Sequence, residues 1–322
     1  MPLFGVDVSR HQGPDINWGK VRASGIDFML ARASLATTPD ATYRSNVRRA
    51  RLAGIPVVGA YHFLYPAKVV SPAEQARLFV DRIGNADGIL TMLDVEKDRN
   101  PKTGQVFIPT ISDVRAFARE FARLTHNHTL IVYAPGWYWT GHIGNPPASD
   151  LGPLCASRYV PVRHDHEGHP IAMTPKEAFA KVTPKFWNPT HGGWKKATIL
   201  QFTSTGRIGG YGGPVDVDAF NGTLQKLKSL TGPVGHAVSA LVPPASTGPA
   251  PDHGKPIVVK PTTKRSHVVV AGETLSGIAA RHGFNATAKL PTFRVMLNAF
   301  PENAKFRANP HVIRPGDRVR VR

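Results

Sequence analysis

Short apolar segments alternate with segments of helical periodicity through roughly the first 230 residues of this 322-residue chain. Start signals such as Ser71-Pro72 and Thr110 precede helical segments. Repeated strand–helix–strand units build a parallel sheet, and about eight strands in ~230 residues favour a closed barrel over an open sheet. The sequence therefore predicts an α/β fold with a closed or nearly closed barrel and with catalytic groups at the C-terminal ends of its strands. The expected strands cover residues 3–8, 28–33, 57–63, 89–95, 130–134 and 199–202, and the expected helices cover residues 43–53, 72–83 and 111–124.

A proline-rich segment interrupts this pattern. It contains seven prolines between residues 233 and 265, few large side chains and no helical or alternating period. Such a segment cannot bury enough apolar surface to fold alone. We therefore expect a domain at 1–232, a linker at 233–265 and a second domain at 266–322.

Carboxylates follow several of the expected strands. Asp7 lies at the end of the first strand, Asp94 and Glu96 lie at the end of another, and Asp216 and Asp218 follow a later apolar run. Residues i and i+2 of a strand share a face about 6 to 7 Å apart, so Asp94 and Glu96 are expected to point into one space. Two carboxyl groups in one pocket divide into a proton donor and an anion, which is the division that glycoside cleavage needs.

Aromatic and amide side chains also lie near the expected strand ends. They are Tyr61, His62, Phe63, Tyr133, Trp137, Trp187 and Gln201. Each aromatic residue taken alone is more often a core residue. Sugar rings, however, present apolar faces to aromatic rings and hydroxyls to polar groups, so the combination with carboxylates favours a carbohydrate cleft.

Six motifs occur in one order: FGVDVSRHQGPDINWGKV, RAS, GAYHFLYP, MLDVE, IVYAPGWYW and LQFTSTGRIGGYGGPVDVDAFNG. Together they span nearly all of residues 3–222, and this region resembles the family 25 glycoside hydrolases, the Chalaropsis-type lysozymes. The resemblance implies an α/β fold of the modified β/α (TIM-like) barrel type. It also implies a peptidoglycan hydrolase (EC 3.2.1.17) that cleaves the β-1,4 bond from N-acetylmuramic acid to N-acetylglucosamine.

The resemblance also implies roles for the carboxylates. Glu96 is the general acid, and Asp94 is the partner anion that orients the 2-acetamido group or stabilises the oxocarbenium-like centre. Asp7 and Asp216 complete the acidic pocket. Both the acetamido oxygen and a carboxylate remain possible nucleophiles, and our hypothesis is retention through the acetamido group.

The substrate contacts implied by the resemblance are Tyr61, Phe63 and Trp187, to which we add Tyr133, Gln201 and Asp218. Asp218 is less expected than Asp216, because the family pattern places the pocket residue first.

One segment, residues 141–182, is longer than the family pattern. It contains five potential metal ligands: His164, Asp165, His166, Glu167 and His169. No HExxH spacing is present, and a Gly-His-Pro sequence favours a turn. We expect a solvated loop at the rim of the cleft, and neither a metal nor a cofactor. A zinc-dependent wall peptidase or amidase is the alternative that depends on this loop.

The expected second domain begins with SHVVVAGETLSGIAARHG and ends with NPHVIRPGDRVRVR. A strand, a helix capped by Thr274, a helix near 293–299 and a strand at 318–321 give a small α+β (βααβ) unit. This unit resembles a LysM domain, which binds N-acetylglucosamine-containing glycans, although residues 283–309 are longer than the family norm. A βααβ fold that touches nucleic acid is the alternative, and no aromatic stacking platform supports it. The implied glycan-binding residues are Gly272, Thr274, Leu275, Ser276, Pro310 and Ile313.

The charge balance indicates anionic partners. The chain has 40 Lys and Arg against 22 Asp and Glu, a formal net charge of +18. No zinc-finger spacing or aromatic RNA-binding signature is present, so an acidic cell envelope is as reasonable a target as nucleic acid, and charge alone does not choose between them. The resemblance implies bacterial peptidoglycan and anionic wall polymers as partners, with no specific nucleic acid. We expect a monomer.

The sequence shows neither a secretion signal nor a long apolar segment, and it has a single cysteine, Cys155. We therefore expect synthesis in a host cytoplasm, no membrane insertion, and action at the cell wall after release, as in a bacteriophage endolysin. The alternatives are a bacterial autolysin and a non-catalytic wall-binding protein, and the acidic pair argues against the latter.

Overall fold

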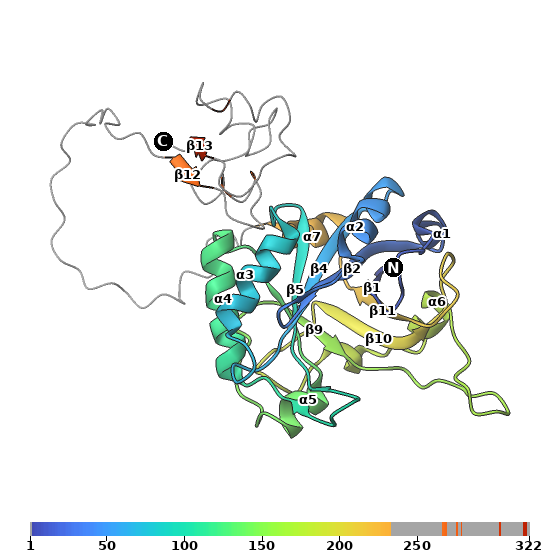
Figure 1. Ribbon diagram of the computed structural model, residues 1–322. Coiled ribbons are helices and arrows are strands. Elements are labelled where there is room, and N and C mark those ends of the chain that lie inside the picture. The colour runs from blue at the N-terminus through green and yellow to red at the C-terminus, as the bar shows by residue number, and fades with distance from the viewer. Residues whose placement is uncertain are drawn as a thin grey trace, which may run out of the picture. The chain divides into compact units, whose positions relative to one another are not determined.

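Eight strands close into a barrel in the computed structural model, which describes residues 2–232, 266–268, 275, 278, 303 and 318–320 (Figure 1). Pairing of the first two strands closes the ring. In order around the barrel the strands are β1 (Leu3–Val8), β11 (Val215–Phe220), β10 (Ile199–Gly206), β9 (Leu154–Ser157), β8 (Ile131–Tyr133), β5 (Ile89–Asp94), β4 (Val57–Phe63) and β2 (Ile26–Leu35). The predicted barrel is thus confirmed.

One strand runs against the others. The expected sheet was parallel, but β11 is antiparallel to both β1 and β10. No helix lies between β10 and β11, and antiparallel neighbours need only a short connection, whereas parallel ones need a crossover. The N-terminal end of β11 therefore lies at the same mouth of the barrel as the C-terminal ends of the other strands.

Helices cover the outside of the barrel (Figure 1). The three predicted helices are confirmed, and local signals explain their starts: Pro72 occupies the first turn of α3, and Thr110 and Asp113 form a capping box on α4. The helices are α1 (Trp18–Ala23), α2 (Tyr43–Leu52), α3 (Pro72–Ile83), α4 (Ile111–Thr125), α5 (Gly136–Gly141), α6 (Pro175–Phe179) and α7 (Leu224–Lys228), with 3-10 turns η1 (Pro184–Trp187) and η2 (Ser229–Thr231). Short pairings occur at β3 (Thr38–Pro39), β6 (Asp98–Arg99) and β7 (Val106–Phe107).

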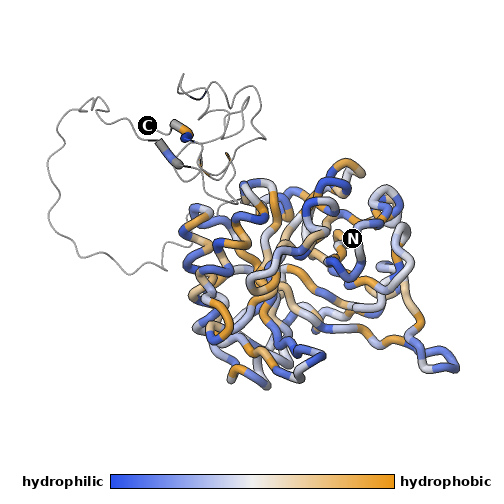
Figure 2. The backbone as a smooth tube through the Cα atoms, viewed as in Figure 1, coloured by the Kyte–Doolittle hydropathy of each residue, from blue (hydrophilic) through white to orange (hydrophobic). Residues whose placement is uncertain are grey.

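The core has an inner and an outer layer, because alternate strand residues face the barrel interior and the helices. Figure 2 shows hydrophobic stretches along the strands and mixed hydropathy along the helices. The inner layer is filled so tightly that glycine is required at two strand positions. A Cβ on Gly5 would lie 2.2 Å from the Phe28 ring, and one on Gly59 would lie 2.7 Å from both the Leu30 side chain and the Leu90 carbonyl oxygen.

We expected the segment 141–182 to be a loop, but it contains strand β9. The short apolar run Leu154-Cys155-Ala156 pairs with β8 and β10 and supplies the eighth strand of the barrel. Its shortness conceals it in the sequence, since three apolar residues have no distinctive period.

The chain divides into two compact units, Met1–Pro243 and Pro244–Arg322. In the second, β12 (Ser266–Val268) pairs antiparallel with β13 (Arg318–Arg320), as expected for the first and last strands. Leu275 and Ile278 are helical and buried, and Leu275 is the one expected glycan-binding residue of this unit among those that the structure describes. The expected linker, the expected helix near 293–299 and the other five glycan-binding candidates lie outside the described residues: Gly272, Thr274, Ser276, Pro310 and Ile313.

A search of the described helices finds none with the length and apolar character needed to cross a membrane.

Candidate active site

Four carboxyl groups meet at one mouth of the barrel. Asp7 on β1 and Asp216 on β11 are register partners. Asp94 is the last residue of β5, and Glu96 follows it two positions later. The charges of these four groups influence one another, which places them in one cluster. The structure therefore brings together the four residues that the sequence indicated as catalytic.

Burial gives this cluster a strong affinity for protons. It raises the pKa of Glu96 to about 7, with Asp216 and then Asp98 adding repulsion. Burial followed by the charge of Asp216 raises the pKa of Asp7 to about 7, and burial raises that of Asp216 to about 6. The cluster thus keeps protons at pH values where ordinary carboxyl groups have lost them.

Asp94 is the more deeply buried member of the expected acid–anion pair. Its exposed fraction is 8%, whereas Glu96 is half-buried. Burial, and after it the charge of Glu96, raises the pKa of Asp94 well above its usual range, and Arg32 opposes this rise. Burial alone therefore favours a proton on Asp94, and an anionic Asp94 needs the positive charge of Arg32.

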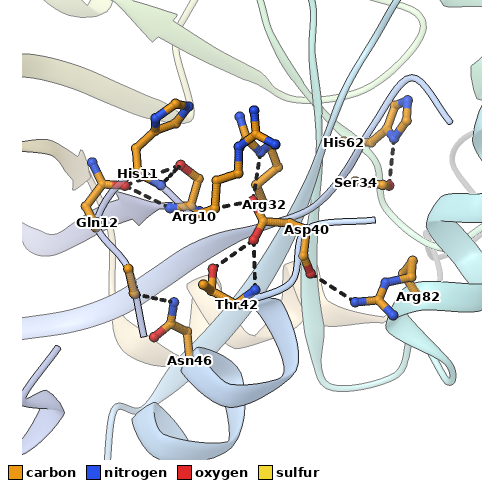
Figure 3. Close-up of polar contacts among 12 residues, drawn as sticks. Arg10, His11, Gln12, Arg32, Ser34, Asp40, Thr42, Asn46, His62 and Arg82 are labelled. Atoms are coloured by element: carbon orange, nitrogen blue, oxygen red, sulfur yellow. Dashed lines mark hydrogen bonds and ion pairs between the residues drawn. The ribbon is translucent and has the colours of Figure 1, made fainter. Parts of the chain in front are cut away.

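Arg32 is held in place by a buried carboxylate (Figure 3). Its Nε donates to Asp40 Oδ2 at 3.0 Å. Asp40 also accepts the backbone N–H groups of Arg10 and Thr42 at 3.0 and 2.9 Å, and the Thr42 hydroxyl at 2.8 Å. Burial alone would raise the pKa of Asp40, but these donors and Arg32 lower it. No spacing rule links Arg32 to Asp40, so the sequence alone does not reveal this pair.

Two of the expected glycan contacts brace the carboxyl cluster instead. Gln201 Nε2 donates to Asp7 Oδ2 at 2.8 Å, and Gln201 Oε1 accepts the Tyr133 hydroxyl at 3.0 Å. Gln201 and Tyr133 are both buried. Their polar atoms bind protein groups, so the structure places them behind the cleft surface.

Asp218 is also placed differently from the expectation. Its side chain is wholly buried, and within the described part of the chain its carboxyl group meets no N–H donor but shares a hydrogen bond with Asp7. Burial, followed by Asp7 and Asp216, raises its pKa well above the usual range. It lies beneath the pocket, because i and i+2 positions place it one layer deeper than Asp216 on the same face of β11.

The expected aromatic lining is found in part. Tyr61 and Phe63 are half-buried at the C-terminal end of β4, and Phe63 is the register partner of Asp94. Trp187, in contrast, ends η1 and lines a hollow of about 630 Å³ with Ala197 and Phe220. Because β10 begins at Ile199 and β11 ends at Phe220, this hollow lies at the opposite end of the barrel. Trp187 therefore does not line the mouth, and that expectation was wrong.

Two exposed aromatic residues lie at the mouth, Trp137, which the sequence indicated, and Tyr159, which it did not. Trp137, on α5 directly after β8, has Lys97 Nζ 5.3 Å from its ring centroid. Tyr159, directly after β9, donates its hydroxyl to Gln201 Oε1 at 2.7 Å. The apolar run before Tyr159 was the available signal for this residue.

The histidine-rich loop forms a small turn rather than a ligand cluster. His164 bridges to Pro170, and His169 Nδ1 lies 3.3 Å from Glu167 and 3.5 Å from Asp165. Within the residues that the structure describes, no group of three or more histidine, cysteine or acidic side chains is arranged to hold a metal ion.

Comparisons with known proteins agree with this geometry. The family model for Glycosyl hydrolases family 25 matches residues 6–211. Lysozyme M1 of Streptomyces globisporus is 29% identical over 236 residues, which cover 70% of this chain and 70% of that protein.

Solved structures of lysozymes share the fold. The bacterial lysozyme of Streptomyces coelicolor matches with a TM-score of 0.56 at 26% identity, covering 72% of this chain and 97% of that one. A family 25 lysozyme of Aspergillus fumigatus matches with a TM-score of 0.52 at 25% identity, covering 72% and 100%. The family model spans more than half of the sequence, and the carboxyl groups of this chain meet at the mouth of its barrel. The chain therefore belongs to family 25 of the glycosyl hydrolases and is a glycoside hydrolase of the lysozyme class.

Proposed function

We propose that the enzyme is an N-acetylmuramidase, which hydrolyses the β-1,4 bond from N-acetylmuramic acid to N-acetylglucosamine in bacterial peptidoglycan. The observation that carries this proposal is the cluster of Asp7, Asp94, Glu96 and Asp216 at the mouth of a family 25 barrel. The similarity to lysozymes supports the choice of peptidoglycan as the substrate.

In this mechanism Glu96 is the general acid. Its pKa of about 7 keeps a proton available near neutral pH for the leaving glycosidic oxygen. Asp94 acts as the anion that orients the 2-acetamido group of the substrate. Arg32 stabilises that anion, since its positive charge opposes the effect of burial on Asp94.

Analysis of the products tests the bond specificity. Purified peptidoglycan is digested and the fragments are identified by mass spectrometry after reduction. We expect muramic acid at the new reducing ends, with activity unchanged in a metal chelator. Free peptides or glucosamine reducing ends would contradict the proposal, and loss of activity in chelator would favour a zinc-dependent peptidase or amidase.

Acetamido participation predicts retention of configuration. Proton NMR of the first product formed should show the β-anomer. A glycan whose muramic residues lack the N-acetyl group should be cleaved much more slowly. An α-anomer, or equal rates on the two glycans, would indicate a different nucleophile.

We further propose that residues 266–322 form a LysM-like wall anchor joined by the linker at 233–265. The helical positions of Leu275 and Ile278 and the pairing of the first and last strands support this proposal. A linker raises the effective concentration of the catalytic unit along the glycan. Chains ending at residue 243 should sediment less with insoluble peptidoglycan than the full chain, and equal sedimentation would contradict the proposal.

The biological role that we propose is host lysis by a phage endolysin acting as a monomer, with a bacterial autolysin as the alternative. The net charge of +18 favours attraction to an anionic wall. Expression inside a susceptible bacterium should cause lysis only after the membrane is permeabilised. Lysis without permeabilisation would favour an enzyme exported by its own host.

A further inference from the structure

The side chain of Gln201 has hydrogen bonds at both ends of its amide. Oε1 accepts from the hydroxyls of Tyr133 and Tyr159 at 3.0 and 2.7 Å. Nε2 donates to Asp7 Oδ2 at 2.8 Å. The side chain is 5% exposed, so water does not compete freely for these bonds. One amide thus connects two phenol groups to one carboxyl group of the cluster.

The donors and acceptors fix where a proton on Asp7 is located. Each tyrosine hydroxyl has a single proton, and both protons point at Gln201 Oε1. The amide therefore faces Asp7 with its N–H group, and Oδ2 must act as the acceptor. A proton on Asp7 is therefore confined to Oδ1, which is buried and receives no N–H group among the described residues, and the neighbouring carboxyl group of Asp218 shares a hydrogen bond with Asp7.

The two tyrosines differ in exposure. Tyr133 is 6% exposed, whereas Tyr159 is 47% exposed. Tyr159 lies directly after β9, and the backbone on either side of it bonds to Gln201 and Phe202 of β10. An exposed aromatic ring beside buried carboxyl groups is a surface on which a sugar face packs. Tyr159 can therefore contact a glycan with its ring while its hydroxyl remains bonded to Gln201.

We propose that Gln201 is a positioning residue that holds the Asp7 proton on Oδ1, and that Tyr159 transmits glycan binding to Asp7 through the Gln201 amide. A glycan that covers Tyr159 excludes water from its hydroxyl, and hydrogen bonds strengthen as the local dielectric falls. The polarised amide then donates more strongly to Oδ2 and stabilises the Asp7 carboxylate. The inference rests on the proposed muramidase function and adds a coupling within the same site.

Other titratable groups also face Asp7, and their charges influence its protonation independently of the Gln201 amide. Arg32 of β2 adds a positive charge beside Asp94. The groups are Asp216 and Asp218 from β11, Asp94 from β5, Tyr61 from β4, Cys155 from β9 and Tyr159 itself. None of these groups except Tyr159 changes in the Tyr159→Phe variant, so a change in its pH profile reports on the phenol hydroxyl.

The test compares pH–rate profiles on soluble, uncrosslinked peptidoglycan chains. Tyr159→Phe keeps the ring and removes the hydroxyl, so KM should stay within about twofold of wild type. The acidic limb of the kcat profile reports ionisation of the carboxyl cluster in the substrate complex, and Asp7 belongs to this cluster. Loss of the hydroxyl weakens the stabilisation of the Asp7 carboxylate, so the limb should move upward by about half a pH unit or more. Tyr159→Ala should show the same shift and a higher KM, because it also removes the ring.

Two Gln201 variants test whether the effect of Tyr159 passes through the Gln201 amide to Asp7. Gln201→Glu keeps the size of the side chain and places a carboxylate against Asp7, so it should move the limb upward by about one unit or more. In a Gln201→Leu background, Tyr159→Phe should have no further effect on the limb, because the path through the amide is already removed. Tyr211→Phe, which removes a hydroxyl from the loop before β11, is the matched control and should leave the profile unchanged.

A folded Tyr159→Phe enzyme whose acidic limb coincides with that of the wild type would overturn the inference. So would a further shift of the full size in the Gln201→Leu background. Failure of the proposed function is distinguishable, since it would appear as wild-type products without muramic reducing ends. An unshifted limb in an enzyme that does form those ends contradicts only the coupling.

Discussion

Asp7 and Asp216 are register partners on β1 and β11, although they come from opposite ends of the catalytic unit. Because β11 is antiparallel, its first residues meet the last residues of β1 at the mouth of the barrel. Both carboxyl groups are desolvated there, and the charge of Asp216 raises the pKa of Asp7. This pairing makes the stability of the protein depend on pH.

We expect the protein to be more stable at pH 5 than at pH 8. The pKa values of Asp7 and Asp216 are raised from 3.8 to about 7 and about 6, so the folded state binds more protons than the unfolded state between pH ~4 and ~7. Stability therefore falls as pH rises through this window. Thermal unfolding at the two pH values measures the difference.

The control for this effect is an exposed carboxyl group. Asp216→Asn should reduce the difference in Tm between pH 5 and pH 8, whereas Asp15→Asn, at an exposed position, should leave it unchanged. If both variants retain the wild-type difference, the carboxyl cluster does not cause it.

Glu96→Gln should lower the lytic rate by about 100-fold or more while the protein stays folded, because general acid catalysis contributes on the order of 10²–10⁴. Its Tm at pH 8 should equal or exceed that of the wild type, since the change removes repulsion within the cluster. Turbidity loss of cell walls and circular dichroism measure the two effects, with exposed Glu167→Gln as the control. A folded variant that keeps more than about a few per cent of the rate would reject Glu96 as the acid.

Asp40→Ala should destabilise the fold by about 3–5 kcal/mol, because it leaves the buried guanidinium of Arg32 without its counter-charge. Asp27→Ala is the matched control, since the ion pair from Asp27 to Arg22 is partly exposed to solvent and should contribute no more than about 1 kcal/mol. Urea unfolding gives both values. Equal losses in the two variants would show that burial of the Arg32 pair has no special importance.

Gly59→Ala should cost about 1–3 kcal/mol, since its Cβ would lie 2.7 Å from the Leu90 carbonyl oxygen inside the barrel. Gly141→Ala at the end of α5 adds a Cβ with no described heavy atom within 4 Å and should cause no loss. Urea unfolding measures the stability of both variants. A Gly59→Ala variant as stable as the wild type would mean that the inner layer can expand.

Trp137→Ala should raise KM by about two- to tenfold, the loss expected for one aromatic surface that contacts a sugar. Trp187→Ala should leave KM unchanged, because Trp187 lies at the other end of the barrel. Steady-state kinetics on soluble glycan chains measure both. A higher KM for the Trp187 variant alone would reverse this assignment of the cleft.

The sequence by itself determined the elements whose signals are local. Strand β4 and helix α3 were predicted to the residue, because a buried strand and a capped amphipathic helix show their periods within a few residues of sequence. The spacing of Asp94 and Glu96 was likewise sufficient to bring them into one pocket, since strand geometry puts i and i+2 on one face.

Only the tertiary structure decided the features that depend on the closing of the barrel. The reversal of β11, the pairing of Arg32 with Asp40 and the bonds of Gln201 to Tyr159 and Asp7 join residues that no local period relates. Trp187 was misplaced for the same reason, because a short aromatic segment has no signal that tells one end of a barrel from the other. Long-range pairing sets strand direction and side-chain partners, and that information resides in the packed chain as a whole.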